Sequence, residues 1–381
     1  MTDRGATRDL RLDFFRGLAL WFIFVDHVPD NVVSWLTIRN FGFSDATEIF
    51  IFISGYAAAT AYARRYEHQG FASMTAHVVR RCWQIYIAHV FLFVVFTAQV
   101  AYVAARFANP MYAEEMNISG FLEEPHVALL EALLLRFRPA NMDVLPLYIV
   151  LLLAFPFVLV AALRQPLALL AASALVYAAA PPLGWNFTTY PGGEGWFFNP
   201  FAWQFLFVIG AVAAAAPQCL GVATRWRPWL GTLAGAYLAF ALCIVATWYV
   251  PQLGDVVPPW LGRILYPIDK TNLDILRLAH FLALAYLVMH FVPRDAAFLG
   301  ARWARPVLDC GRQSLHVFCL GIFLSFAAHL ALVELDGSIP AQVLVSAVGI
   351  ALMVGLARLV SWYQGIDREP RRGAGTPERP A

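Results

Sequence analysis

Ten apolar stretches, each about as long as a membrane helix, follow one another along this chain of 381 residues. Roughly 17–25 predominantly apolar residues are enough for an α-helix to cross a bilayer. We therefore predict an all-α polytopic membrane protein with about ten transmembrane helices, at residues 12–30, 44–63, 82–104, 144–163, 167–183, 199–217, 229–250, 273–292, 311–333 and 340–362.

The composition agrees with a membrane protein. Hydrophobic residues make up 60% of the chain and charged residues only 14%, whereas about 25% of a typical soluble protein is charged. The net charge of +2 gives no indication of a nucleic-acid partner. The chain has no internal repeat and no soluble domain. We predict one transmembrane domain at residues 1–363 and a polar, disordered cytoplasmic tail at residues 364–381.

The basic residues predict the orientation. No small-residue cleavage site follows the first apolar run, so we expect a retained helix rather than a signal peptide. Ten spans place both termini on one side, and Arg and Lys are enriched on the cytoplasmic side. With cytoplasmic termini, the inner segments hold 20 of the 27 Arg and Lys residues. We therefore predict that both termini are cytoplasmic.

The cysteines indicate neither disulfides nor a metal site. None falls in a segment predicted to be outside, and no two have the spacing of metal ligands. We expect no metal and no disulfide among the five, which are Cys82, Cys219, Cys243, Cys310 and Cys319.

The first apolar stretch carries a cation at one end and an Asp26–His27 pair at the other. Ionisable groups are costly in a membrane helix. Eleven residues separate Arg16 from His27, which is about three helical turns and roughly 16 Å. Both side chains therefore share one face at opposite depths and can line a cleft. In the alternative interpretation, Arg16 reaches the inner lipid phosphates and His27 lies in the outer interface.

The second stretch enters from the outside with two acids. Asp45 and Glu48 are three residues apart, so they share a helix face, at about the depth of His27. An acid beside an imidazole orients it and raises its basicity, as general-base catalysis requires. Asp45 is alternatively an N-cap. Further in, the sequence SGYAAATA offers small residues for close helix packing.

These motifs carry a family resemblance. An Arg followed by ten residues and a His, then EIFIFISGY in the second stretch and an Arg pair before the third, resembles the acyltransferase-3 superfamily. The chain more closely resembles the OpgC family of succinyltransferases that modify osmoregulated periplasmic glucans. The segments that support this are RLDFFRGLALWFIFVDH, FGFSDATEIFIFISGY, PIDKTNLDILRLAHFLALAYL and GRQSLHVFCLGIFLS.

The resemblance implies an O-acyltransferase of the bacterial inner membrane, with acyl-coenzyme A (succinyl-coenzyme A) as cytoplasmic donor and a periplasmic glucan as acceptor. His27 matches the superfamily's essential histidine and Arg16 its essential arginine, and Arg80–Arg81 match the Arg pair. Asp26 departs from the pattern, and the resemblance gives it no role. His27 is the expected general base, with Asp26, Glu48 and Asp45 as the acidic candidates around it, at a mouth facing the periplasm.

A second polar group lies at the outer end of the eighth stretch. Lys270, Asp274 and Arg277 are spaced by four and three residues, so we expect them to share a helix face. One interpretation is a salt-bridge ladder in which Asp269 and Asp274 neutralise the cations. The other is a cationic site for the free carboxylate of a succinyl group, with Asn272 beside it.

Further candidates lie at both membrane faces. Arg80, Arg81 and Arg312 are expected to collect the phosphates of coenzyme A, although a positive-inside topology explains most inner arginines without a ligand. Outside, Trp196 is a candidate for stacking on sugar rings, with an aromatic belt as the alternative. Asn141 is a candidate sugar ligand close to an expected helix N-cap.

Two functions of other classes stay open at this stage: a secondary transporter of an anionic small molecule, and a non-catalytic partner of a glycan synthase. The sequence shows no paired broken helices and no repeat, which argues against the transporter. Direct transfer and an acyl-enzyme route both remain open. A homo-oligomer is compatible with the sequence.

Overall fold

The computed structural model describes residues 9–221, 225–254 and 257–366. The described residues are mostly helical and contain no strand; one isolated bridge pairs Thr188 with Gly195. The predicted all-α class is therefore confirmed for this part of the chain. The predicted tail at 364–381 falls almost entirely on residues 367–381, outside the described residues.

The chain divides into two compact units, which we describe separately. The central unit comprises residues 34–293, and the terminal unit comprises residues 1–33 with residues 294–381.

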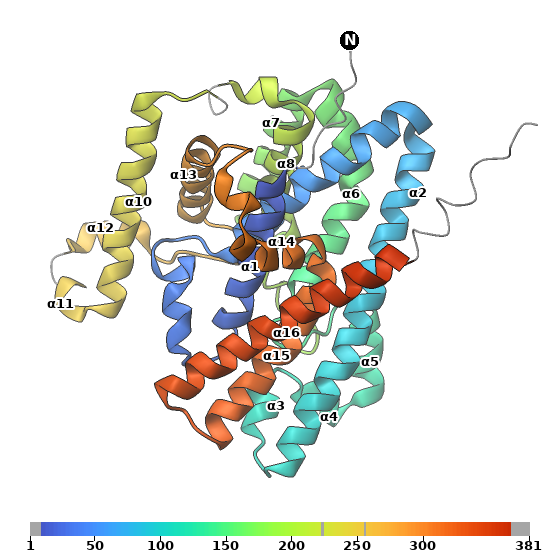
Figure 1. The fold of residues 1–381 in the computed structure, drawn as a ribbon, viewed down its shortest axis with the longest axis vertical. Coiled ribbons are helices and arrows are strands. Elements are labelled where there is room, and N and C mark those ends of the chain that lie inside the picture. The colour runs from blue at the N-terminus through green and yellow to red at the C-terminus, as the bar shows by residue number, and fades with distance from the viewer. Residues whose placement is uncertain (1–8, 222–224, 255–256, 367–381) are drawn as a thin grey trace, which may run out of the picture. The chain divides into compact units, whose positions relative to one another are not determined.

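The central unit contains most of the helices (Figure 1). The long α2 packs along α8 and α6, α7 packs on α8, and α10 packs on α13. The elements of this unit are η2 (Ile38–Asn40), α2 (Ala46–Arg106), α3 (Met111–Glu115), α4 (Ser119–Glu123), α5 (Pro125–Leu133), α6 (Val144–Arg164), α7 (Pro166–Ala179), α8 (Pro200–Ala215), η3 (Pro217–Leu220), α10 (Pro228–Tyr249), α11 (Pro251–Gly254), α12 (Pro259–Leu265) and α13 (Ile275–Phe291).

Helix α2 contains two predicted spans, 44–63 and 82–104, separated by a break at Gly70. This residue has φ +78° and ψ 180°, a conformation that only glycine adopts without strain. The blue and cyan halves of α2 consequently run in different directions in Figure 1.

Reciprocal glycines bring α2 and α8 into backbone contact. A Cβ on Gly55 would lie 2.0 Å from the carbonyl oxygen of Phe207, and a Cβ on Gly210 would lie 2.2 Å from that of Phe52. Small residues at such positions let membrane helices approach closely. The predicted packing role of the SGYAAATA segment is therefore confirmed at Gly55.

The terminal unit is built on α1, which packs against α14 and α15. Gly17 and Gly311 form a second reciprocal contact, because a Cβ on either would lie 1.9 Å or 1.8 Å from a backbone oxygen of the other helix. Helix η1 (Val32–Leu36) lies at the boundary of the two units. The elements of the terminal unit are α1 (Leu10–Asp26), η4 (Ala297–Gly300), η5 (Arg302–Ala304), α14 (Arg305–Arg312), α15 (Ser314–Glu334) and α16 (Ile339–Ile366).

Each predicted apolar stretch falls on a helix of the structure. Five helices of the described chain, α2, α6, α10, α15 and α16, are long and apolar enough to cross a membrane, and α7, α8 and α13 are shorter apolar helices. The described part of the protein is therefore all-helical, with several candidate spans. The number of crossings and the side of the termini stay predictions.

Candidate functional site: a buried four-charge cluster and the Arg16–His27 helix

Two acids and two cations meet where α2 begins, and we call them the four-charge cluster: Asp45, Glu48, Lys270 and Arg277. Lys270 Nζ lies 2.6 Å and Arg277 Nη2 lies 3.0 Å from the same oxygen, Asp45 Oδ2. Arg277 also reaches Glu48 Oε1, with Nε at 2.8 Å and Nη2 at 2.7 Å. Charge-assisted hydrogen bonds of this kind are short and strong. The cluster therefore ties the start of α2 to α13 and the turn before it.

Each of the two carboxylates uses one oxygen to accept a backbone N–H at the start of α2 and the other oxygen to contact the cations. Asp45 Oδ1 accepts the Thr47 N–H at 2.8 Å, and Glu48 Oε2 accepts the Asp45 N–H at 2.9 Å. This reciprocal pair is a capping box, which satisfies backbone donors that a helix start leaves open. The alternative interpretation of Asp45 as an N-cap is thus confirmed, and its place among the catalytic acids stays a prediction. The second oxygen of each acid is left for Lys270 or Arg277.

The salt-bridge ladder with Asp269 and Asp274, one of the two interpretations of Lys270 and Arg277, is not found among the described ion pairs. Helix α13 begins at Ile275, so Lys270 lies in the preceding turn rather than on the helix. Asp274 is the N-cap and accepts the Leu276 N–H at 2.8 Å. Asp269 accepts the Thr271 N–H at 2.7 Å. Because both local acids serve the backbone, the described ion pairs of the cations go to Asp45 and Glu48, more than 200 residues earlier.

A hydrogen-bond network holds the Lys270 turn. Asn199 Nδ2 donates to Asn272 Oδ1 at 2.8 Å, and Asn272 Nδ2 donates to Asp269 Oδ2 at 2.6 Å. Trp203, which is fully buried, donates its indole N–H to the Lys270 carbonyl at 3.1 Å. Asn272 is thus engaged in positioning Lys270. Its predicted contact with substrate stays a prediction.

Lys270 is the most accessible member of the cluster. Its side chain is 31% exposed, compared with 10% for Arg277 and 0% for Glu48. The ammonium lies 5.9 Å and 5.6 Å from the ring centres of Phe197 and Phe198, within cation–π range. An ammonium has three donor hydrogens. The described contacts of Lys270 Nζ occupy one of them, so the group can still bind an acceptor.

His280 fixes the segment that leads into the cluster. It lies one turn after Arg277 on α13, and its Nδ1 is 2.7 Å from Ser44 Oγ. A Cβ on Gly42 would lie 1.9 Å from His280 Nε2, so only glycine fits there. The residues immediately before Asp45 are therefore anchored to the helix that supplies Arg277.

A second ion pair lies in the segment before α6. Arg138 Nε donates to Asp143 Oδ1 at 2.8 Å. Burial raises the pKa of the Asp143 carboxyl, and the charge of Arg138 opposes that rise. Asp143 is the N-cap residue of α6 but makes no side-chain capping bond. Asn141 lies between the two at φ +68°. Its predicted role toward a sugar stays a prediction.

Trp196 packs its ring face against Arg138 of this ion pair. The Arg138 guanidinium carbon is 4.4 Å from the Trp196 ring centre, and Phe187 meets the ring edge to face. Trp196 is only 4% exposed, and its indole Nε1 has no hydrogen-bond partner among the described residues. Arg138 thus occupies a face of the ring that was predicted to stack on a sugar. The stacking role stays a prediction.

Helix α1 of the terminal unit carries Arg16, Asp26 and His27, all partly buried. The helix ends at Asp26, and His27 is its C-cap, with its backbone N–H directed at the carbonyls of Ile23 and Phe24. The prediction of helix through residue 30 is therefore too long, because Pro29 disfavours the helical conformation of the residue before it. Because α1 continues as far as its C-cap His27, Arg16 and His27 still belong to one helix and are about 16 Å apart along its axis.

The predicted phosphate ligands lie in different settings. Arg312 ends α14, is 41% exposed, and lies 3.8 Å from Asp13 Oδ2 and 3.7 Å from Asp309 Oδ1. Arg80 is exposed on α2, and Arg81 donates to Gln84 Oε1 at 3.3 Å.

His27 belongs to the terminal unit and Glu48 to the central unit. Their proximity stays a prediction.

The comparisons with known proteins bear on the family. The family model described as OpgC protein matches residues 8–365, which is nearly the whole chain. Comparison with curated proteins and with solved structures gives no match.

Proposed function

The chain belongs to the OpgC family, and we propose that it is a membrane O-acyltransferase that moves a succinyl or related acyl group from acyl-coenzyme A to hydroxyl groups of periplasmic glucans. The observation that carries the proposal is the family match over residues 8–365. The candidate spans of the described chain support a membrane location. A cytoplasmic donor and a periplasmic acceptor imply the bacterial inner membrane, as in the acyltransferase-3 superfamily that the motifs resemble.

In the proposed reaction, His27 acts as general base. It takes the proton of a glucan hydroxyl while the oxygen attacks the thioester carbonyl carbon. The new C–O ester bond forms, the C–S bond breaks, and the coenzyme A thiolate takes the proton from the His27 imidazolium and leaves on the inner side. Asp26, adjacent in the chain, is the acid we favour for orienting His27, because both oxygens of Glu48 already have partners in its own unit.

The donor is proposed to approach along α1. Arg16 lies toward the predicted cytoplasmic end of that helix, about 16 Å before His27. A donor that extends its pantetheine arm along this face would bring the thioester to the imidazole. Arg80, Arg81 and Arg312 are the proposed ligands of its phosphates, because guanidinium groups bind phosphate in a planar, two-point manner.

The acyl end and the acceptor are assigned to the predicted periplasmic side. Lys270 has donor hydrogens left beyond its contact with Asp45, which supports a role in binding the free carboxylate of a succinyl group. Asn272 in the Lys270 turn, Asp274 at the α13 N-cap and Arg277, which shares Asp45 Oδ2 with Lys270, are proposed to complete this site. Trp196 and Asn141 are the proposed contacts of the glucan.

The experiment is coenzyme A release. Purified protein in detergent is mixed with succinyl-coenzyme A and a glucan, free thiol is measured with time, and the glucan is analysed for the added mass of a succinyl group. We expect thiol release that requires the glucan. A stoichiometric burst of thiol without glucan would indicate an acyl-enzyme instead of direct transfer. No thiol release, with anion uptake into proteoliposomes, would favour the transporter; neither activity would favour the non-catalytic partner.

A further inference from the structure

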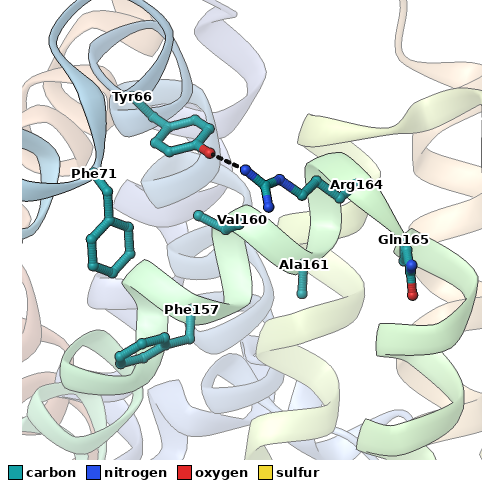
Figure 2. A pocket seen from close by; sticks show the side chains of 7 residues that line it. All are labelled: Tyr66, Phe71, Phe157, Val160, Ala161, Arg164 and Gln165. Carbon is teal, nitrogen blue, oxygen red and sulfur yellow. Dashed lines mark hydrogen bonds between the residues drawn. The ribbon is translucent and has the colours of Figure 1, made fainter.

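An open groove of about 440 Å³ lies between α2 and α6 in the central unit (Figure 2). Tyr66 and Phe71 contribute to it from α2, on either side of the break at Gly70. Phe157 and Arg164 contribute from the last part of α6. The groove therefore lies where the first half of α2 and helix α6 both end.

The groove has one polar and one apolar end. Arg164 Nη2 lies 3.3 Å from the hydroxyl oxygen of Tyr66, and Figure 2 shows both side chains at the same end. Phe71 and Phe157 lie 5.7 Å apart, centre to centre, at the other end, with Val160 between the two parts. An amphiphile is the class of ligand that matches such a division.

Arg164 has no carboxylate partner among the described residues. Its one described contact is with the neutral Tyr66 hydroxyl, and the side chain is exposed. The four-charge cluster, in contrast, provides a carboxylate for each of its cations. An unneutralised guanidinium with five donors favours a phosphate or carboxylate ligand.

The apolar end of the groove is accessible from outside the protein. Phe157 is 71% exposed and Phe71 is 40% exposed, and both belong to helices that are candidate membrane spans. The predicted topology places the inner ends of spans 44–63 and 144–163 at the cytoplasmic face. Anionic lipids of that leaflet attract basic side chains near the membrane surface.

We propose that this groove binds one anionic phospholipid from the cytoplasmic leaflet. Its phosphate contacts the Arg164 guanidinium and the Tyr66 hydroxyl, and an acyl chain lies along Phe71, Phe157 and Val160. Because Tyr66 and Phe71 flank Gly70, the lipid also links the two halves of α2 to α6 and stabilises the protein when it binds.

The test uses the purified full-length protein in detergent with phosphatidylglycerol as probe. Binding is followed by the lipid-dependent rise in the midpoint of thermal unfolding and by lipid adducts in native mass spectrometry. We expect Arg164→Gln to weaken binding about fivefold, the effect of one basic side chain near an anionic surface. Val160→Trp fills the groove and leaves the cation, so it should weaken binding too. Arg227→Gln, at an exposed arginine on the same predicted side, should bind like wild type.

Equal binding of phosphatidylglycerol by wild type, Arg164→Gln and Val160→Trp would overturn the proposal. Inorganic phosphate that raises the unfolding midpoint as much as the lipid would also overturn it, since the apolar half of the groove would then be unused. If Arg164→Gln is less stable without lipid, Arg164→Lys provides the decisive comparison. Recovery of lipid binding in that variant supports the proposal, and failure to recover it counts against the site.

Discussion

Arg277 holds Glu48 through two nitrogens on one oxygen, with Nε and Nη2 at 2.8 Å and 2.7 Å from Oε1. Glu48 is fully buried, and Arg277 is nearly so. A buried charge whose partner is removed costs far more than a surface ion pair contributes. This contact therefore has two roles: it neutralises both groups, and it fixes α13 against the start of α2.

Arg277→Met should destabilise the protein by about 3–5 kcal/mol, because Glu48 is then left as an uncompensated buried acid. The measurement is the midpoint of thermal unfolding in detergent. Arg263→Met is the matched control, since Arg263 is exposed on α12 and its loss should leave the midpoint unchanged.

Combining Arg277→Met with Glu48→Gln should recover part of that loss. Glutamine keeps an oxygen for the Asp45 N–H and removes the buried charge. A double variant that is as unstable as the sum of the two single variants would show that the charge of Glu48 has no energetic link to Arg277.

The helices could be predicted from the sequence more completely than the contacts between them. The lengths of the apolar stretches were enough to predict α6, α10 and α13, because a helix that crosses a bilayer needs roughly 17–25 predominantly apolar residues in a row. The break in α2 could not be predicted in the same way, since Gly70 lies in a polar connection between two apolar stretches. Helix ends were set by local chemistry, such as Pro29 after α1.

The sequence did not predict the four-charge cluster, because Asp269 and Asp274 lie closer in the chain to Lys270 and Arg277 and offered one interpretation of their ion pairing. Asp269 and Asp274 are instead used by adjacent backbone N–H groups, as is usual for Asp at turns and N-caps. A usable signal was present. The predicted topology put two acids and two cations at the same outer depth, and buried charges in a membrane protein pair with one another.

His27→Ala should lower acyl transfer by about 10²–10⁴-fold, the usual contribution of a general base. The helix end should survive, because the described capping contact of His27 uses its backbone N–H rather than its ring. Rates are measured by thiol release at saturating donor, with His126→Ala on the exposed face of α5 as control. Turnover equal to wild type in the purified His27 variant would remove this residue from the mechanism.

Arg16 and the Arg80–Arg81 pair should act on the donor, because the predicted topology places them toward the cytoplasm. Substituting Ala for Arg16, or for both members of the pair, should weaken binding of acyl-coenzyme A in a direct assay such as calorimetry. If donor affinity is unchanged and the glucan KM rises instead, these arginines belong to the acceptor site.

The contact between α2 and α8 should tolerate no added side chain at Gly210. Its Cβ would lie 2.2 Å from the Phe52 carbonyl oxygen, so Gly210→Ala forces the helices apart at a cost of about 1–3 kcal/mol. Gly235→Ala is the control, because nothing lies within 4 Å of that position on α10 and alanine is the better helix former. Comparable unfolding midpoints for the two variants would mean that the α2–α8 contact relaxes without loss.

Lys270 provides the most direct test of acyl choice. Both cations of the cluster already pair with carboxylates, so a bound succinyl group would be received by the donor hydrogens that Lys270 has left. Succinyl carries a terminal carboxylate, and acetyl does not. Lys270→Met keeps much of the side-chain volume and removes the charge, so it should depress transfer of succinyl more than transfer of acetyl.

The expected size follows from the bond that is lost. A charge-assisted hydrogen bond contributes about 1.5–3 kcal/mol, which is roughly a ten- to hundred-fold change in the succinyl-to-acetyl ratio of kcat/KM. That ratio is measured in wild type and Lys270→Met with both donors. Lys270 also neutralises Asp45, so some loss common to both donors is expected and does not bear on the question. An unchanged ratio would assign Lys270 to the scaffold or to the acceptor site, because only a carboxylate contact distinguishes the two acyl groups.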